Sequence, residues 1–235
     1  MLDIDESFEA IDEKGASRLV SANLWNGAED DLCVWALLDG QWIPDLVPRL
    51  LKSELEFCSL FEGPLTQNRI LSSPYLVKLE REHSITKWLL KDGWGRGWGV
   101  FFQASSMRAA ELYPHVTAEH LTRRNARGEF FCSEGLFCAE DATALRLRRH
   151  FRRFTQVELE ADGRFVAFRF FDPAVLRTYL FGCAPAEIES FFGPVRFFLM
   201  EWFSEAERLR QPEKMLLVSR KTVWTDGIGQ GKTET

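Results

Sequence analysis

Apolar runs of strand length alternate with amphipathic segments through the first half of the chain. Residues 32–38 (LCVWALL) form one such run, which ends at Asp39-Gly40, a pair typical of turns. Three further runs with strand character lie at residues 57–61, 75–80 and 98–104. Apolar positions at helical spacing predict helices within 43–53 and 84–93. This alternation indicates a fold that combines strands and helices.

A helix predicted over residues 141–154 has two faces of different chemistry. Its apolar residues recur at helical spacing and predict a core-facing stripe of Ala144, Leu147, Phe151 and Phe154. The basic residues of its other stripe are Arg146, Arg149 and Arg153. We expect this basic stripe to be exposed to solvent.

Alternation of polar and apolar residues on both sides of Ala161-Asp162-Gly163 predicts a hairpin that joins the sheet. Asp172 is predicted to cap the next helix, with Pro173 as its first residue. Apolar residues three and four apart over 185–209 predict two helices or one kinked helix, and 214–224 predict a last edge strand. The expected class is therefore α/β (α+β), with a mixed central sheet flanked by helices and a helical C-terminal part.

Charge is distributed unevenly along the chain. Residues 1–31 hold nine acidic against two basic residues, which gives −7 and leaves +1 of the total net charge of −6 for the remainder. The acidity and a weak helical pattern predict a loosely packed N-terminal arm over 1–31. An α/β domain is expected over 32–209, with an insertion at 106–139 where no simple period holds. An edge strand and a flexible tail are expected over 210–235.

Composition argues against several classes of partner. Binding to nucleic acid needs a basic surface that displaces counterions from phosphate, and the chain has only one local basic stretch. No apolar stretch approaches the length of a membrane span, and the acidic N-terminus lacks the features of a signal peptide, so no membrane partner is expected. The five cysteines are an odd number and lie mainly in apolar runs, which favours a reducing compartment. The expected location is the cytoplasm.

Residue patterns able to carry out catalysis are sparse. No nucleophile or zinc-protease signature occurs. Carboxylates do end predicted strands at Asp39, Glu62 and Asp172, where acids in α/β sheets can converge on a ligand. The residues that directly follow these acids are Gly40, Gly63 and Pro173. Since turns and helix caps account for such pairs without chemistry, we expect no catalytic residues.

A zinc site is the other chemical candidate. The possible ligands within the predicted insertion are His115, His120, Cys132 and Cys138. The two cysteines are separated more widely than the cysteine pairs of zinc sites usually are. We therefore expect neither a metal nor another cofactor.

Seven spaced segments occur in an order that is specific when taken together. They are CVWALLDG, CSLFEGPL, SPYLVKLE, WLLKDGWGRGWGVFF, LRRHFRRF, FRFFDPAVLRTYL and AEIESFFGPVRFFL. Over roughly Leu32–Trp202 the chain resembles the effector chaperone (adaptor) family of bacterial type VI secretion systems. The FRFFDP segment and the glycine/tryptophan segment that contains Trp94 and Trp98 are the most distinctive.

The resemblance implies a cytoplasmic protein that holds a toxic effector by its N-terminal region and passes it to the spike protein of the secretion needle, without catalysis. The chain departs from the family between Ser106 and Ala139, where the family runs directly from the WGVFF strand into the basic helix. We predict a partner surface of arginines and aromatic residues, because these dominate interface energetics. Its members are Phe130, Phe131, Phe137, Arg146, Arg149 and Arg153.

Two other functions remain open at this point. An immunity-type inhibitor is also small, acidic and cytosolic, but it blocks a toxin instead of delivering it. A hydrolase that uses Asp39, Glu62 and Asp172 requires these carboxylates to converge in a pocket.

Overall fold

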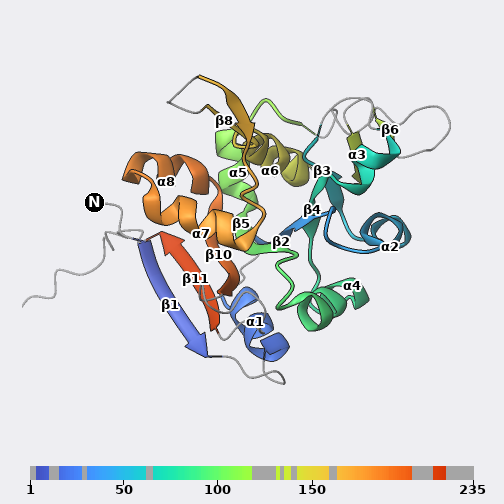
Figure 1. Cartoon of the computed structure of the whole chain (residues 1–235), viewed down its shortest axis with the longest axis horizontal. Coiled ribbons are helices and arrows are strands. Elements are labelled where there is room, and N and C mark those ends of the chain that lie inside the picture. Colours follow the sequence, from blue (N-terminus) through green and yellow to red (C-terminus); the bar gives the residue numbers. More distant parts are fainter. Residues whose placement is uncertain are drawn as a thin grey trace, which may run out of the picture.

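A nine-stranded sheet forms the centre of the computed structural model, which describes residues 4–10, 16–27, 31–61, 66–117, 131–132, 135–138, 142–158, 163–202 and 214–220. The strand order is β1-β11-β10-β5-β2-β4-β3-β7-β6 (Figure 1). All of the strand pairs described are antiparallel. The strands are β1 (Ile4–Ala10), β2 (Leu32–Asp39), β3 (Phe57–Ser59), β4 (Pro74–Lys78), β5 (Gly99–Ser105), β6 (Phe131–Cys132), β7 (Gly135–Cys138), β10 (Val195–Trp202) and β11 (Lys214–Arg220).

Helices cover both faces of this sheet. One face is covered by α5 (Ser106–Leu112), α6 (Ala142–Arg152), α7 (Pro173–Gly182) and α8 (Pro185–Phe192). The other is covered by α1 (Ala16–Leu24), α2 (Leu46–Lys52), α4 (Ser84–Trp88) and the π-helical turn η1 (Leu89–Gly93). The short helix α3 (Gln67–Leu71) lies beside α2 (Figure 1). The α/β (α+β) prediction of a central sheet flanked by helices is confirmed, but the described strands of that sheet pair only antiparallel, so the prediction of a mixed sheet is wrong for them.

Strand β2 contributes to the cores on both sides of the sheet. Trp35 and Leu37 belong to the core beneath α5–α8, whereas Val34, Ala36 and Leu38 belong to the core on the opposite face. Side chains alternate between the two faces of a strand. A strand that is covered on both sides must therefore be apolar throughout, which explains the uninterrupted run LCVWALL.

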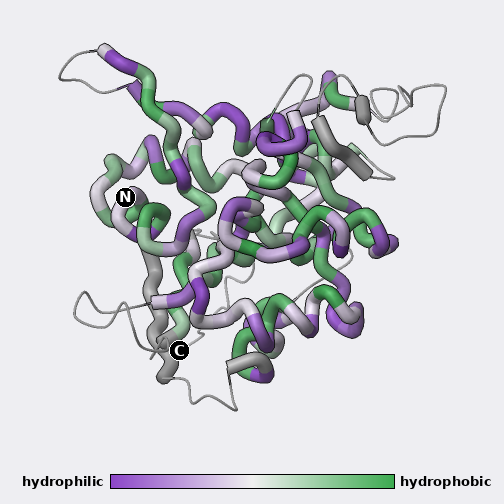
Figure 2. Tube along the Cα trace, turned by 45° about the vertical axis from the view of Figure 1, so that its right-hand side comes forward, coloured by the Kyte–Doolittle hydropathy of each residue, from purple (hydrophilic) through white to green (hydrophobic). Residues whose placement is uncertain are grey.

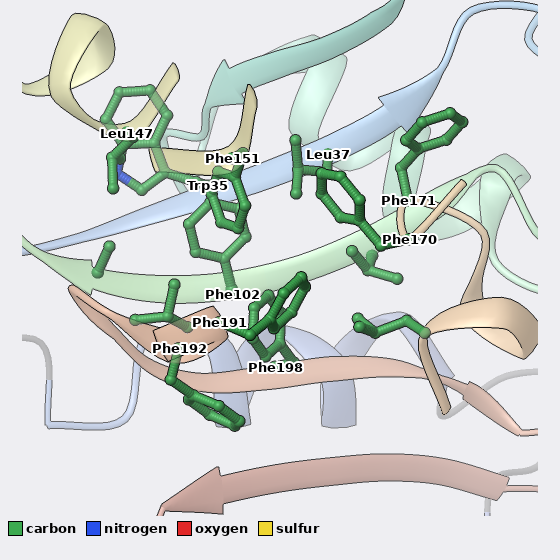
Figure 3. Packing of buried hydrophobic residues seen from close by; sticks show 14 of the residues in the cluster. Trp35, Leu37, Phe102, Leu147, Phe151, Phe170, Phe171, Phe191, Phe192 and Phe198 are labelled. Atoms are coloured by element: carbon green, nitrogen blue, oxygen red, sulfur yellow. The ribbon is translucent and has the colours of Figure 1, made fainter. Parts of the chain in front are cut away.

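The core beneath α5–α8 is rich in phenylalanine (Figure 3). The ring of Phe102 in β5 lies 5.2 Å from that of Phe151 in α6, in an edge-to-face arrangement. The rings of Phe191 in α8 and Phe198 in β10 are 5.5 Å apart. Much of the chain's high phenylalanine content is thus used to join helices to the sheet, and truncating such a ring to alanine costs about 3–5 kcal/mol.

The N-terminal segment is part of the fold, and the prediction of a loosely packed arm is wrong for its described residues. Strand β1 pairs with β11 along its whole length. Val20 and Leu24 of α1 are fully buried. The side-chain amide of Gln103 donates to the carbonyl oxygen of Leu24 at 2.6 Å, which ties α1 to β5. An edge strand tolerates an acidic sequence because one of its sides stays open to solvent.

The prediction of helices throughout residues 185–209 is also wrong, because α8 is followed by a strand. Gly193, at φ 49°, and Pro194 end the helix, and β10 enters the sheet between β5 and β11. The buried residues of β10 occupy both faces of the strand, which is covered on both sides, and such a dense apolar segment contains positions three and four apart without being helical. Strand β11 confirms the strand predicted there, but it lies inside the sheet and not at its edge.

The predicted hairpin is present, but it does not join the central sheet. Strands β8 (Gln156–Glu158) and β9 (Phe165–Ala167) pair with each other in a separate two-stranded sheet. Figure 1 shows β8 projecting from the body of the molecule, and Phe165 is 69% exposed. In Figure 2, hydrophobic and hydrophilic positions are interleaved along the outer helices, as expected for elements with one covered face.

Part of the segment predicted as an insertion is integral to the fold. Helix α5 packs against α6, and its Ala109 is fully buried. Strand β7 pairs with β3 and so extends the sheet. The helices predicted around 43–53, 84–93 and 141–154, and after Asp172, are confirmed.

Candidate functional site

The two most distinctive sequence segments meet at the end of β2. Asp39 is 2% exposed, and its Oδ2 accepts a hydrogen bond from Arg169 of the FRFFDP segment. The backbone N–H of Asp39 donates to the carbonyl oxygen of Trp98, 2.8 Å away in the glycine/tryptophan segment. The N–H of Gln41 donates to Oδ1 at 3.1 Å. Asp39 therefore joins segments that are far apart in the sequence.

The ion pair of Asp39 and Arg169 is partly shielded from water. Burial raises the pKa of Asp39, and the guanidinium of Arg169 opposes this rise. The side chain of Arg169 is 36% exposed, so solvent screens the pair from one side. Removing one partner of a fully buried pair costs about 3–5 kcal/mol, and about 2 kcal/mol is expected here because of that screening.

A second buried acid, Glu201 of β10, holds the glycine/tryptophan loop. The side chain is 3% exposed, and its Oε2 accepts a hydrogen bond from the N–H of Gly97 at 2.9 Å. The N–H groups of Gly95 and Arg96 lie near enough to this carboxylate to lower its pKa. Gly95 and Gly97 have φ angles of 90° and 64°, which glycine adopts without steric cost. The glycines thus let three successive N–H groups converge on one acid.

Burial raises the pKa of Glu201 to about 7, although the three backbone donors lower it. The nearby charge of Asp172 acts in the same direction as burial. Sequence reasoning missed Glu201 because its segment was interpreted as helical. An acid directly after the apolar run FFLM was the available signal.

Two of the three strand-end carboxylates that a hydrolase requires, Asp39 and Asp172, have partners within the fold. Asp172 Oδ1 accepts from the N–H groups of Ala174 and Val175, at 2.9 and 3.4 Å, and so caps α7, in which Pro173 is the first residue. The charge of Asp172 is near enough to raise the pKa of Asp39. Two predicted residues, Glu62 and Gly63, lie outside the described part of the chain.

Metal ligands do not cluster within the described residues, where no group of three or more His, Cys, Asp or Glu side chains is placed to hold an ion. Of the possible zinc ligands, His115 is exposed, His120 lies outside the described residues, and Cys132 and Cys138 fall in β6 and β7.

The tryptophans of the glycine-rich loop pack inward. Trp98 is 7% exposed, and its ring lies 5.0 Å from that of Trp88. Trp94 stacks on Phe101 at a centroid distance of 6.2 Å. Arg96 places its guanidinium 5.5 Å from the ring of Trp98. These contacts indicate that the loop has a structural role.

Helix α6 carries one arginine that sequence reasoning missed. Arg148 is 7% exposed, and its Nε and Nη2 donate to the carbonyl oxygens of Ser59 and Phe61, at 2.7 and 3.1 Å. It thereby joins α6 to β3. Arg148 lies four residues after Ala144 and three before Phe151, both fully buried, and this spacing placed it on the core side of the helix.

The three arginines of the predicted partner surface differ in their surroundings. Arg149 is exposed. Arg146 is half-buried and donates from Nε to the carbonyl oxygen of Val116 at 3.1 Å. Arg153 is exposed and donates from Nη1 to the hydroxyl of Tyr113 at 3.1 Å. The aromatic members of this surface are Phe130, which lies outside the described residues, Phe131 in β6 and Phe137 in β7.

Beside this surface, α6 meets α5 and α8 at a hollow of about 300 Å³. The buried His150 donates from Nε2 to the carbonyl oxygen of Phe191 at 2.7 Å, so in the neutral ring Nδ1 accepts from the Tyr113 hydroxyl, 2.9 Å away. A Cβ on Gly193 would lie 2.3 Å from the His150 ring, so this glycine permits a close approach. The hollow is lined by Arg108, Leu112, Tyr113, His150, Arg153, Glu189, Ser190 and Gly193.

Residues 34–131 and 117–190 match the family described as Domain of unknown function (DUF4123). The chain belongs to the DUF4123 family. It matches no curated protein and no solved structure.

The DUF4123 match contains most of the contacts described above. It includes Asp39, the glycine/tryptophan loop, Arg169 and the whole of α6. The partners β1, β10 and β11, and with them Glu201, lie outside the matched residues. The glycine loop inside the DUF4123 match is therefore held by an acid from beyond it.

Within the described residues of this DUF4123 chain, no helix is both long and apolar enough to cross a lipid bilayer.

Proposed function

We propose that this chain is a type VI secretion adaptor, or chaperone, which works in the cytoplasm. It binds the N-terminal region of a cognate toxic effector and loads that effector onto the spike protein of the needle, without catalysing a reaction. The observation that carries this proposal is membership of the DUF4123 family, which is associated with type VI secretion effector adaptors. The order of the seven sequence segments supports the same function.

The use of charged groups in the described part of the chain is consistent with a binding protein. Asp39, Asp172 and Arg148 contact neighbouring segments and stabilise the fold. Large apolar side chains such as Trp42 and Phe165, at 57% and 69% exposure, remain on the surface. Exposed aromatic residues and arginines are the types that contribute most to protein interfaces.

Affinity capture from the native bacterium tests this function. The tagged chain should enrich one toxin and the spike protein over an unrelated tagged protein of similar size. Deleting the gene should stop secretion of that toxin and leave other secreted effectors unchanged. Enrichment of neither partner, or unchanged secretion after deletion, would overturn the proposal. Loss of the toxin's activity on mixing with the purified chain, with secretion unchanged, would identify an immunity-type inhibitor instead.

The same capture tests the predicted basic partner surface. Arg149→Glu is the cleanest variant, because Arg146 and Arg153 also bond to neighbouring groups of the fold. It should reduce toxin capture while the melting temperature stays unchanged. Full capture by the variant would reject this surface but would leave the adaptor function in place.

A further inference from the structure

An apolar pocket of about 420 Å³ lies where the turn after β2, the first turn of α2, and α3 come together. Its volume is within the range of about 300–1,000 Å³ that is usual for ligand pockets. Leu71, at the end of α3, lines it and is 48% exposed. Trp42, which precedes the lining residue Ile43, is 57% exposed. The full lining is Gly40, Gln41, Ile43, Asp45, Leu46, Val47, Pro48, Asn68, Leu71 and Ser72.

Hydrogen bonds fix the walls of this pocket. The N–H of Gly40 donates to the carbonyl oxygen of Ser73 at 3.1 Å, and a Cβ on Gly40 would lie 2.4 Å from that oxygen. The hydroxyl of the buried Tyr75 donates to the carbonyl oxygen of Ile70 at 2.8 Å. The turn and α3 are thereby held together before any partner arrives, which lowers the entropic cost of binding.

Asp45 is the only charged side chain among the described residues that line the pocket. It directly precedes α2 but makes no side-chain hydrogen bond to the helix. Its backbone lies in the left-handed region, at φ 56° and ψ 22°, where residues other than glycine are uncommon. The carboxylate is exposed and forms no ion pair with any described residue. Its charge is therefore available to a partner.

We propose that this pocket receives an arginine side chain of a protein partner. The aliphatic stem of that arginine lies against Ile43, Leu46 and Leu71, and its guanidinium pairs with Asp45. The proposal rests on the adaptor function only in taking the partner to be a protein.

Charge complementarity favours a basic occupant over an apolar or an acidic one. An apolar side chain would desolvate Asp45 without compensating its charge, and an acidic one would repel it. The nearest arginine of α2, Arg49, has its guanidinium 4.4 Å from the ring of Trp88, so it is directed to α4. Arg169 donates to Gln41 at 3.3 Å but is paired with Asp39. Neither cation neutralises Asp45.

Titration of the full-length chain with two small probes tests the pocket. Acetyl-arginine-methylamide carries the proposed group, and acetyl-citrulline-methylamide has nearly the same shape without the charge. The backbone N–H signals of Ile43 and Leu46, which line the pocket, should shift saturably with the arginine probe. The citrulline probe should bind about fivefold more weakly, as expected for an exposed ion pair. Asp45→Asn should remove this difference, whereas Glu80→Gln, which changes an exposed acid elsewhere, should preserve it.

Absence of a saturable shift at Ile43 and Leu46, equal binding of the two probes, or an unchanged preference in Asp45→Asn would each overturn the proposal. Circular dichroism and thermal melting establish that both variants fold. The adaptor function fails separately: a chain that binds the arginine probe but captures no toxin retains the pocket and loses the adaptor function. A chain that captures its toxin but fails the probe titration retains the function and loses the pocket.

Discussion

The inner and outer sides of α6 carry the same residue type in opposite environments. Arg148 is buried and joins the helix to β3 through the carbonyl oxygens of Ser59 and Phe61. Arg149, the next residue, is exposed. The environment of a charge, and not its type, therefore decides whether it stabilises the fold or is available to a partner.

The turn after β2 repeats this contrast with acids. Asp39 is buried, bonded to Arg169 and attached through its backbone to Trp98. Asp45, at the far end of the turn, is exposed and makes no cap hydrogen bond. Buried members of these pairs should affect stability when they are changed, and exposed members should affect binding.

The largest effect on the free energy of unfolding is expected when Arg148 is replaced. Arg148→Met keeps an unbranched apolar stem but leaves two carbonyl acceptors without their donor, at about 1–3 kcal/mol each. We expect the free energy of unfolding to fall by about 3 kcal/mol. The matched variant Arg149→Met should change it by less than about 0.5 kcal/mol. Urea denaturation measures both, and equal effects at the two positions would remove the distinction between the sides of α6.

The pH dependence of stability is expected to show the titration of the buried Glu201 carboxyl. Its pKa is raised to about 7 from an ordinary value of 4.5, so between these pH values the folded protein holds a proton that the unfolded chain has released. Stability from this group is therefore complete in acid and is lost as the pH rises toward 7. The loss should amount to about 2 kcal/mol between pH 5 and pH 8.

Glu201→Gln keeps an acceptor for the N–H groups of Gly95 and Gly97 but cannot titrate. Urea unfolding at several pH values should show the wild type losing stability relative to this variant as the pH rises. Asp39, whose pKa is also raised, contributes with the same sign and is present in both proteins. A difference between the two proteins that stays constant from pH 5 to pH 8 would contradict a buried, titrating Glu201.

Local patterns in the sequence were sufficient to predict β2, β4, β5, α6 and α7, because each has one clear period or one clear cap. They were insufficient for β10, whose apolar residues serve two cores and include positions three and four apart. They were also insufficient for β1, because its acidic sequence has little strand character and its place depends on pairing with β11, more than 200 residues away. Long-range pairing of this kind leaves no local signal.

The candidate site shows the same limit. The motifs FRFFDP and DGWGRGWG identified the segments that meet at Asp39, but not Arg169 as its partner or Glu201 as the acid beneath the loop. Both contacts join residues more than 100 positions apart. The pocket at Asp45 depends on α3, a helix of five residues that is too short to give a periodic pattern.

The smallest effect on the free energy of unfolding is expected at Asp45. Substitutions at this position therefore separate stability from binding most clearly. Asp45→Gly relieves a left-handed backbone conformation, and we expect the free energy of unfolding to rise by about 0.5 kcal/mol. Asp45→Asn, which tolerates the same conformation, should leave it nearly unchanged. Both variants should lose the preference for the arginine probe, because both lack the carboxylate. Urea denaturation and the probe titration on the same samples measure the two properties. A destabilised Asp45→Gly protein would show that this acid stabilises α2, and the contrast with Asp39 would then fail.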